Sequence, residues 1–413
     1  MVTTPIYMDN HATTRTDPRV VEAMLPFFTE TFGNAGSSGH AFGWEARDAI
    51  DIARQSIATA INASPRELVF TSGATESNNL AIRGVAERPR RKGNHFISVA
   101  TEHPAVLDPL KKLARRNFDV TILPVTQDGS AEAGIVAAER VAEAIRDDTI
   151  LVSVMLANNE IGAIPALAEI GAVCREREVL LHCDATQAVG RIPVDVEALN
   201  VDLMSFTSHK IYGPKGVGAL YVRRRRPYVS LESQIDGGGQ EGTLRSGTLN
   251  VSGIVGFAKS LELCIEELPG ESERLAKLRN ALMAGLQKQL DGVYVCGPAL
   301  DAAGRRLPGN LNVRFDGVDG EALMMSMNEL AVSTGSACTS AKPEPSHVLR
   351  ALGLSDDQVR SSLRFGLGRF NTDEEVEFAV DAVVEGVQRL RRLSSLPSSL
   401  SVVTPPDVQG IGE

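Results

Sequence analysis

The sequence predicts an α/β fold with a mostly parallel sheet, and three observations support this class. Between about residues 67 and 222, short apolar or β-branched runs alternate with longer segments of helical period. The short runs are apolar throughout, which is typical of strands covered on both faces. The chain has 413 residues, of which 43% are hydrophobic and 23% charged, as expected of a globular protein with two or three folding units.

The alternating region defines the order of the elements. Strands are expected at residues 68–70, 96–99, 120–125, 150–155, 179–183, 202–206 and 218–222. Helices are expected near residues 76–87, 105–116, 136–146 and 166–177. Strand–helix–strand succession predicts a sheet with helices on both faces. Ligands of such sheets bind beyond the carboxyl ends of the strands, so residues that follow each strand are the first site candidates.

A second unit is expected after the Gly-rich segment 236–242. A long helix near 250–291 leads into a smaller α+β domain, with strands near Tyr294, 311–315 and 363–365 and a helix near 373–392. The predicted division is residues 16–260 for the large domain, residues 1–15 and 261–393 for the small domain, and residues 394–413 as a tail. The tail is rich in Ser and Pro and lacks periodicity, which predicts disorder.

Charge and composition argue against several classes of protein. The net charge of −10 opposes direct binding of nucleic acid, and no run of about 18 apolar residues could cross a membrane. The first residues lack the pattern of a secretory signal, and the five cysteines form no Cys-x-x-Cys pair. We therefore expect a cytoplasmic protein. The arginines at 223–226 indicate a solvated strand end, with an acidic partner or RNA contact as the alternative.

Polar residues follow three of the expected strands. In segment 71–77, Gly73 permits a tight turn, and the amides of the following helix could bind phosphate, with Thr75 adding a hydroxyl group. A simple helix cap is the alternative. Asp184 ends a buried strand, where a carboxylate needs a partner. It is either a cap or ion pair, or the group that keeps a ring nitrogen protonated. Lys210 is either exposed or a desolvated Schiff-base lysine.

Together these three features suit pyridoxal phosphate (PLP). The cofactor needs an anchor for its phosphate, a carboxylate for its ring nitrogen and a lysine for its aldehyde. One sheet edge would supply all three from segment 71–77, Asp184 and Lys210.

Further motifs follow one another from residue 7 to about residue 393. They lie at residues 7–9, 12–14, 32–34, 71–79, 101–103, 158–162, 184–187, 209–216, 245–248, 336–340 and 363–365. In this order they resemble the cysteine desulfurases of the class V aminotransferase superfamily, especially the type with a long cysteine loop that serves iron–sulfur cluster assembly and nitrogen fixation. The resemblance implies a PLP-dependent, aminotransferase-like fold (fold type I).

The resemblance implies a role for each matching position. Lys210 would bind PLP covalently, Asp184 would pair with the ring nitrogen, and His103 would stack on the ring and move protons. The remaining ring contacts would be Asn159 and Gln187. The phosphate contacts would be Ala74, Thr75, Thr207, Ser208 and His209, together with Thr248 from the neighbouring subunit of a homodimer. Asn34 and Arg364 would bind the substrate carboxylate, for which the arginine fork is suited.

Cys338 would accept sulfur from the substrate. It lies in the small-residue segment 333–340, which can form little core, and an exposed thiol can become a reactive thiolate. An incidental loop cysteine is the alternative. The implied reaction converts L-cysteine to L-alanine and leaves a persulfide on Cys338. Expected acceptors are an iron–sulfur scaffold or a tRNA-thiolation protein, and Cys338 would transiently contact a nascent cluster as a metal ligand.

Other functions compatible with the sequence are a selenocysteine lyase or another class V PLP enzyme and, more distantly, an inactive cofactor-binding assembly platform. The chain departs from the family pattern at His11, where a small or amide residue is more usual. It departs again at residues 207–208, where Ser-Gly or Ser-Ala is commoner, and after Leu393.

Overall fold

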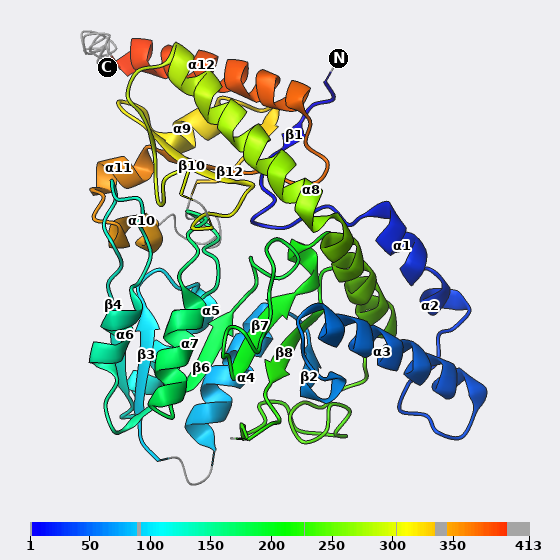
Figure 1. Ribbon diagram of the computed structural model, residues 1–413. Helices are drawn as coiled ribbons and strands as arrows, with labels where there is room; N and C mark the ends of the chain where they lie inside the picture. Colours follow the sequence, from blue (N-terminus) through cyan, green and yellow to red (C-terminus); the bar gives the residue numbers. More distant parts are fainter. Residues whose placement is uncertain (1, 89–91, 227, 303, 335–344, 395–413) are drawn as a thin grey trace, which may run out of the picture.

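The computed structural model describes residues 2–88, 92–226, 228–302, 304–334 and 345–394 (Figure 1). The predictions for Cys338 and for residues 395–413 of the tail lie outside the described residues. A small unit with three sheet strands stands on a larger unit with seven, and the long helix α8 (Val251–Gln289) runs through both.

The larger sheet confirms the predicted α/β class. Its strands are β2 (Leu68–Thr71), β3 (His95–Val99), β4 (Asp119–Leu123), β5 (Thr149–Ser153), β6 (Leu180–Asp184), β7 (Leu203–Thr207) and β8 (Gly218–Val222). They are arranged in the order β2-β8-β7-β6-β5-β3-β4. Strand β8 runs antiparallel to both of its neighbours, and the other neighbouring pairs are parallel. The carboxyl ends of β2, β3, β5, β6 and β7 therefore share one edge.

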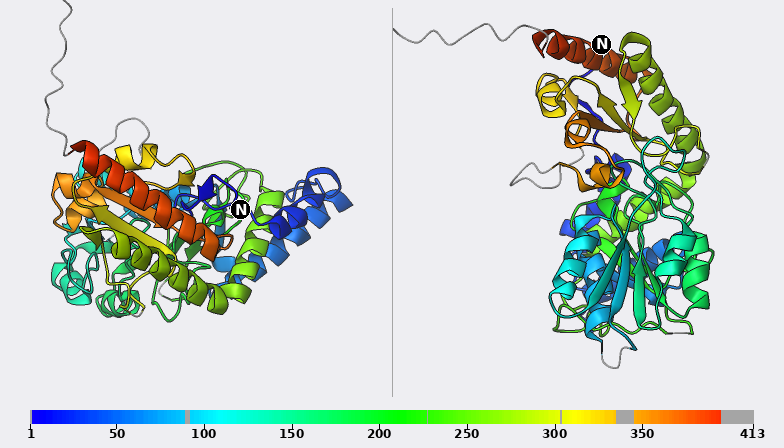
Figure 2. Two further views of the ribbon diagram at one scale, coloured as in Figure 1. Left: turned by 90° about the horizontal axis from the view of Figure 1, so that it is seen from above. Right: turned by 90° about the vertical axis from the view of Figure 1, so that its left-hand side faces the viewer.

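Helices cover both faces of this sheet (Figure 2). On one face lie α4 (Ala74–Glu87) and α5 (Pro104–Ala114), and their core includes Phe96. On the other lie α3 (Ala41–Ala60), α6 (Ala138–Ala144), α7 (Leu167–Glu176) and the start of α8. The next residue, Ile97, packs into that second core, so successive side chains of a strand alternate between two buried faces.

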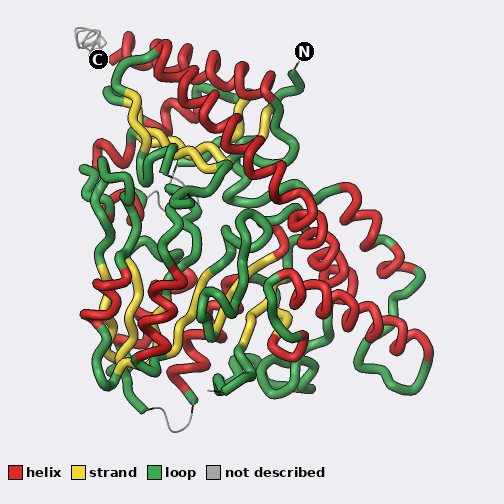
Figure 3. Tube along the Cα trace, viewed as in Figure 1, coloured by secondary structure: helices red, strands yellow, loops and turns green. Residues whose placement is uncertain are grey.

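The smaller unit contains the antiparallel sheet β12-β10-β9 (Figure 3). Its strands are β9 (Val293–Val295), β10 (Asn310–Phe315) and β12 (Ser362–Gly366), and β1 (Ile6–Tyr7) pairs separately with β11 (Leu330–Ala331). Helix α12 (Asp373–Ser394), α9 (Gly320–Met325) and the second half of α8 share its core, which includes Leu282, Phe315 and Val383.

The two units exchange some segments. Helices α10 (His347–Ala351) and α11 (Asp356–Arg360) lie in the sequence between β11 and β12 of the small unit, yet Val348 and Val359 belong to the core of the large sheet. In α8, Cys264 belongs to the large core and Leu278 to the small one. The expected boundary at residues 260–261 stays a prediction.

Two short helices, α1 (Pro18–Met24) and α2 (Pro26–Thr29), lie beside α3 at the right of Figure 1. The sequence pattern did not predict α1, α2 or α3. No helix in the described part of the chain has the length and apolar character needed to cross a membrane.

Candidate active site

A cavity of about 550 Å³ lies at the shared edge of carboxyl ends in the large sheet. The predicted site residues that line it are Ala74, Thr75, His103, Asn159, Asp184, Gln187, Thr207, His209 and Lys210. The volume falls within the range of roughly 300–1,000 Å³ that is usual for small-molecule sites. The cavity therefore brings together groups that come from five different strand ends.

The last residue of β6, Asp184, is buried in the cavity wall. Its Oδ2 accepts a hydrogen bond from Asn78 Nδ2 at 2.7 Å, and its Oδ1 accepts one from the Thr186 amide at 3.0 Å. Both donors are neutral, so they orient the carboxylate without cancelling its charge. Sequence reasoning did not single out Asn78, although helical spacing puts it one turn after Ala74 and Thr75.

The start of α4 forms the part of the cavity that suits a phosphate. Gly73 is the N-cap residue, with φ of +151°, and the helix has no side-chain cap. The first-turn amides of Ala74 and Thr75 thus remain available, with the positive end of the helix dipole behind them. An ion pair of 2.9 Å between Glu76 and Arg245 fixes the loop that leads to Thr248 against this turn.

Lys210 closes a short 3-10 turn after β7. Its Nζ donates to the carbonyl oxygens of His11 and Ala12, each at 2.6 Å. The amine is therefore held against the N-terminal segment at the cavity wall. Across the cavity, Thr186 Oγ1 is buried without a partner among the described residues. The cavity thus fits PLP: the helix amides suit its phosphate, the carboxylate suits its ring nitrogen and the lysine suits its aldehyde. The unpartnered Thr186 hydroxyl group is a further polar contact for the cofactor.

His103 caps α5, and its Nδ1 accepts a hydrogen bond from the Ala105 amide at 3.0 Å. Burial lowers the pKa of His103, so the ring is neutral near pH 7. With Nδ1 used as an acceptor, the proton of the neutral ring resides on Nε2.

A second acidic side chain, which sequence reasoning missed, lies beside His103. Glu102 is fully buried, and burial together with the charge of Asp184 raises its pKa well above the usual range. Its Oε1 accepts a hydrogen bond from the Met155 amide at 2.5 Å. Burial therefore favours the neutral form of the Glu102 carboxyl group beside the Asp184 side chain.

Four predicted residues do not line the cavity. Asn34 Oδ1 accepts from the Gly36 amide at 2.9 Å within its own loop, and Thr248 is exposed. Ser208 Oγ is buried without a partner in the described structure, close to Gly213. Arg364 lies behind Asn159, whose carbonyl it contacts at 3.1 Å. The roles expected for these four residues stay predictions.

The residues that flank segment 335–344 contact residues next to those that line the cavity. On one side, the backbone of Ser333 pairs with that of Arg364. On the other side, Ser346 Oγ donates to Glu160 Oε2 at 2.5 Å, and His347 Nε2 donates to the Glu102 carbonyl at 2.8 Å. Both ends of the segment that contains Cys338 are thus attached beside the site.

Cysteines within the described residues are all buried, at positions 174, 183, 264 and 296. Burial raises the pKa of Cys174, Cys264 and Cys296 to about 12 and raises that of Cys183 as well. None of these thiols is a thiolate at neutral pH. In the same described part of the chain, no group of three or more His, Cys, Asp or Glu residues is placed to hold a metal ion.

Comparisons with known proteins agree with this geometry. Residues 6–378 match the family described as aminotransferase class-V. The chain is 55% identical over 392 residues to cysteine desulfurase IscS of Anaeromyxobacter sp. (strain K), covering 95% of both chains. It is 52% identical over 395 residues to cysteine desulfurase IscS of Neisseria meningitidis strain Z2491, covering 96% of this chain and 95% of that one.

Solved structures show the same fold. A NifS-like protein aligns with a TM-score of 0.85 and 37% identity, over 93% of this chain and 99% of that one. A structure described as SspA in complex with cysteine aligns with a TM-score of 0.77 and 34% identity, over 90% of this chain and all of that one.

Proposed function

This chain belongs to the class-V aminotransferase family, and we propose that it is a PLP-dependent cysteine desulfurase that converts L-cysteine to L-alanine. The observation that carries the proposal is one cavity that holds the uncapped start of α4, Asp184 and Lys210. The identities to desulfurases over nearly the whole chain support cysteine as the substrate.

Residues of the cavity hold the cofactor in one orientation. The amides of Ala74 and Thr75 bind the phosphate, and Asp184 keeps the ring nitrogen protonated. Asn159 and Gln187, which also line the cavity, would contact the ring. Bound PLP withdraws electrons from the substrate Cα and so makes the bonds of that atom easier to break.

Proton transfer is the work of Lys210 and His103. The Lys210 amine takes the proton from the substrate Cα, and the carbonyls of His11 and Ala12 limit where Nζ can lie. The neutral His103 ring carries its proton on Nε2, because its Nδ1 accepts a hydrogen bond from the Ala105 amide. Nε2–H can therefore donate a hydrogen bond to a reacting atom, and it passes its proton on only when Nδ1 takes up another.

Arg364 gives the site its preference for an amino acid carboxylate. Its guanidinium is almost completely buried, and Nη2 pairs with Asp9 at 2.7 Å. Nε has no partner among the described residues. This arginine is thus held next to Asn159, which lines the cavity, and with Asn34 it is the residue proposed to bind the substrate carboxylate.

Cys338 accepts the sulfur. Its thiolate attacks the substrate sulfur, an S–S bond forms, and the Cβ–S electron pair returns to the substrate, whose Cβ is then protonated to give alanine. The attachment of both flanks beside the cavity supports this assignment, as do the raised pKa values of the other thiols.

The persulfide passes to a separate acceptor protein, either an iron–sulfur scaffold or a tRNA-thiolation protein, and Cys338 contacts a nascent cluster on the scaffold. The enzyme works as a homodimer in which Thr248 of each subunit reaches the phosphate of the other. Its expected location is the cytoplasm, which the small number of cysteines and the lack of a Cys-x-x-Cys pair support.

The test is to incubate the PLP-loaded protein with L-cysteine and to measure alanine and the mass of the Cys338 peptide. We expect equal alanine and persulfide in a single turnover. Cys338→Ala should keep the cofactor absorbance and lose both products, whereas Cys174→Ala, which removes a buried thiol, should retain both. Unchanged persulfide and alanine in Cys338→Ala would refute the assignment. No alanine from cysteine in any variant, with product from selenocysteine, would identify a selenocysteine lyase.

A further inference from the structure

Arg191 follows the Asp184 strand end and lies beside Lys210, but none of the roles above uses it. Its Nε and Nη2 both donate to the Lys210 carbonyl, at 3.1 and 2.8 Å. Nη2 also donates to the Asn10 carbonyl at 2.7 Å, and Nη1 lies 3.0 Å from His11 Nδ1. Among the described residues, none of its hydrogen bonds goes to a carboxylate.

The Arg191 guanidinium therefore contacts two parts of the chain that fix the position of the catalytic lysine. One is the backbone of Lys210 itself. The other is segment 10–12, whose His11 and Ala12 carbonyls accept hydrogen bonds from Lys210 Nζ at 2.6 Å. The two parts are about two hundred positions apart in the sequence, and Arg191 joins them alongside the hydrogen bonds that Thr14 makes with the His209 carbonyl. A planar group with five N–H donors can make four hydrogen bonds to three acceptors in a fixed geometry, which an ammonium group with three donors cannot.

His11 extends these contacts to the cofactor side. It is 1% exposed, and burial, followed by the charge of Arg191, keeps its pKa well below the usual range. Arginine can only donate, so His11 Nδ1 accepts and the proton of the neutral ring resides on Nε2. His11 Nδ1 also lies 3.0 Å from Gln187 Oε1, but with Nδ1 unprotonated neither atom can donate to the other. Gln187 Nε2 still donates to the His11 carbonyl at 2.9 Å.

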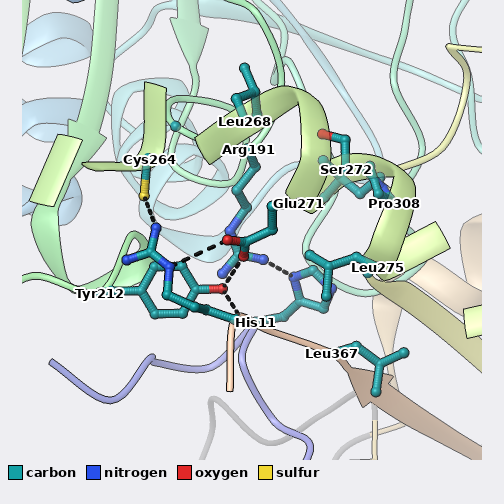
Figure 4. A pocket seen from close by; sticks show the side chains of 14 residues that line it. His11, Arg191, Tyr212, Cys264, Leu268, Glu271, Ser272, Leu275, Pro308 and Leu367 are labelled. Carbon is teal, nitrogen blue, oxygen red and sulfur yellow. Dashed lines mark hydrogen bonds and ion pairs between the residues drawn. The ribbon is translucent and has the colours of Figure 1, made fainter. Parts of the chain in front are cut away.

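A second, small cavity lies behind this arrangement. It measures about 30 Å³, and its lining includes His11, Arg191, Tyr212 and Glu271 (Figure 4). His11 Nε2 is buried without a partner in the described structure. The space is sufficient for about two water molecules, which would complete the hydrogen bonding of His11 without moving Arg191.

We propose that Arg191, together with His11, is a positioning residue for Lys210: it fixes the lysine backbone and the carbonyls that bind the lysine amine in one rigid unit. The proposal rests on the proposed function, in which Lys210 moves the Cα proton. Arg191 also places a positive charge close to Lys210, where Lys215 and Arg364 are the other cations in the surroundings. His209 is neutral there, because burial lowers its pKa to about 4. The carboxylates that face these cations are Asp184 in the large cavity and Glu271 beside Arg191.

Two measurements separate positioning from general stability. The first is the pH midpoint of the absorbance of bound PLP, which reports on charge near Lys210. The second is the rate of exchange of the Cα proton of L-alanine in D₂O, which needs Lys210 and PLP but not Cys338. Arg191→Lys keeps the positive charge but loses the planar guanidinium with its four hydrogen bonds. We therefore expect the pH midpoint of the PLP absorbance to stay within about 0.3 pH units and the rate of Cα proton exchange to fall about tenfold or more.

Arg191→Met loses both the positive charge and the planar guanidinium. We expect its midpoint to rise by about one pH unit and its exchange rate to fall at least as far as in Arg191→Lys. His11→Asn keeps an acceptor for Arg191 and should resemble the unmodified enzyme. His11→Leu removes that acceptor and should lower exchange about three- to tenfold with little change in midpoint.

Arg306→Met is the matched control, since Arg306 is also buried and donates to the carbonyls of Cys296, Pro298 and Asn310. It should lower the melting temperature without changing midpoint or exchange. Equal exchange rates and midpoints in Arg191→Met and Arg306→Met would overturn the proposal. If Arg191→Met does not fold, unchanged exchange in both Arg191→Lys and His11→Leu overturns it. A failure of the desulfurase assignment appears differently, as absence of alanine from cysteine in the unmodified enzyme while PLP absorbance persists.

Discussion

Glu160 connects the cofactor side of the cavity with the end of the cysteine segment. It follows Asn159, and its carboxyl group contacts Ser346, the N-cap residue of α10, at 2.5 Å. The charge of Arg364 and the Ser346 contact favour the ionised form, but burial outweighs them and raises the pKa of Glu160 to about 7. A single carboxyl group at this position therefore changes its charge within the physiological pH range.

We predict that Glu160 makes the folded protein less stable as the pH rises from about 4.5 to about 7. In this range the folded state holds a proton that the unfolded state releases, so the contribution is complete below pH 4.5 and is lost by about pH 7. The full difference is about 3 kcal/mol. Urea unfolding at several pH values should show this slope in the unmodified protein but not in Glu160→Gln.

Glu377→Gln is the control for the Glu160 prediction, since Glu377 is exposed on α12. It should keep the slope of the unmodified protein. Parallel stability curves for Glu160→Gln and Glu377→Gln would show that Glu160 does not titrate in this range.

At the scale of an element, α4 makes the anion site because of how it begins. Its N-cap is a glycine at a φ of +151°, a conformation that L-residues avoid. The neighbouring strand also approaches closely, since a Cβ at Gly218 would lie 2.7 Å from Gly73 Cα. At the start of α4, only backbone atoms therefore lie between the helix and a bound phosphate.

Gly73→Ala should weaken PLP binding, because alanine at this φ costs about 1–3 kcal/mol and will shift the first-turn amides. We expect the dissociation constant of PLP to rise about tenfold or more in absorbance titrations of the apoprotein. Gly270→Ala, in α8 with open space around it, should leave the constant unchanged. An unchanged constant in Gly73→Ala as well would mean that the helix start does not bind the phosphate.

On the scale of the whole molecule, α1–α3 carry an apolar surface that a monomer would expose to water. Phe28, Phe32, Phe42 and Trp44 are 50–62% exposed, and the rings of Phe32 and Phe42 lie 5.3 Å apart. These helices project from the side of the large unit (Figure 1). Apolar patches of this kind usually mark an interface. The expected reach of Thr248 into a neighbouring site points to a second copy of this chain as the partner.

Phe32→Asp should convert the dimer to monomers at micromolar concentration in sedimentation velocity experiments, because a charge cannot be buried unpaired in an apolar contact. PLP binding should weaken at the same time, since each site would lose Thr248 of the other subunit. Met325→Asp changes a residue that is 72% exposed on α9 and should have neither effect. A stable dimer of Phe32→Asp would place the interface elsewhere.

Local patterns explain why so much of the large unit could be predicted. Strand β6 was expected at residues 179–183 and spans Leu180–Asp184, and α4 was expected at 76–87 and spans Ala74–Glu87. Apolar runs and helical periods act over a few residues, and a parallel sheet brings the carboxyl ends of its strands to one edge. Helices α1–α3 were not expected from the pattern, although α3 buries Ala46, Ile50 and Ile57 at helical spacing.

The sequence by itself determined the α/β class, the order of the elements and the positions of Asp184 and Lys210 after their strands, because each depends on short-range patterns. Only the tertiary structure decided which side chains meet. It placed Arg191 on the Lys210 carbonyl, Asn78 on Asp184 and Asp9 on Arg364. The Asp184 and Arg364 contacts join residues more than one hundred positions apart. Such pairs form only when packing closes long loops, so they cannot be predicted from local periodicity.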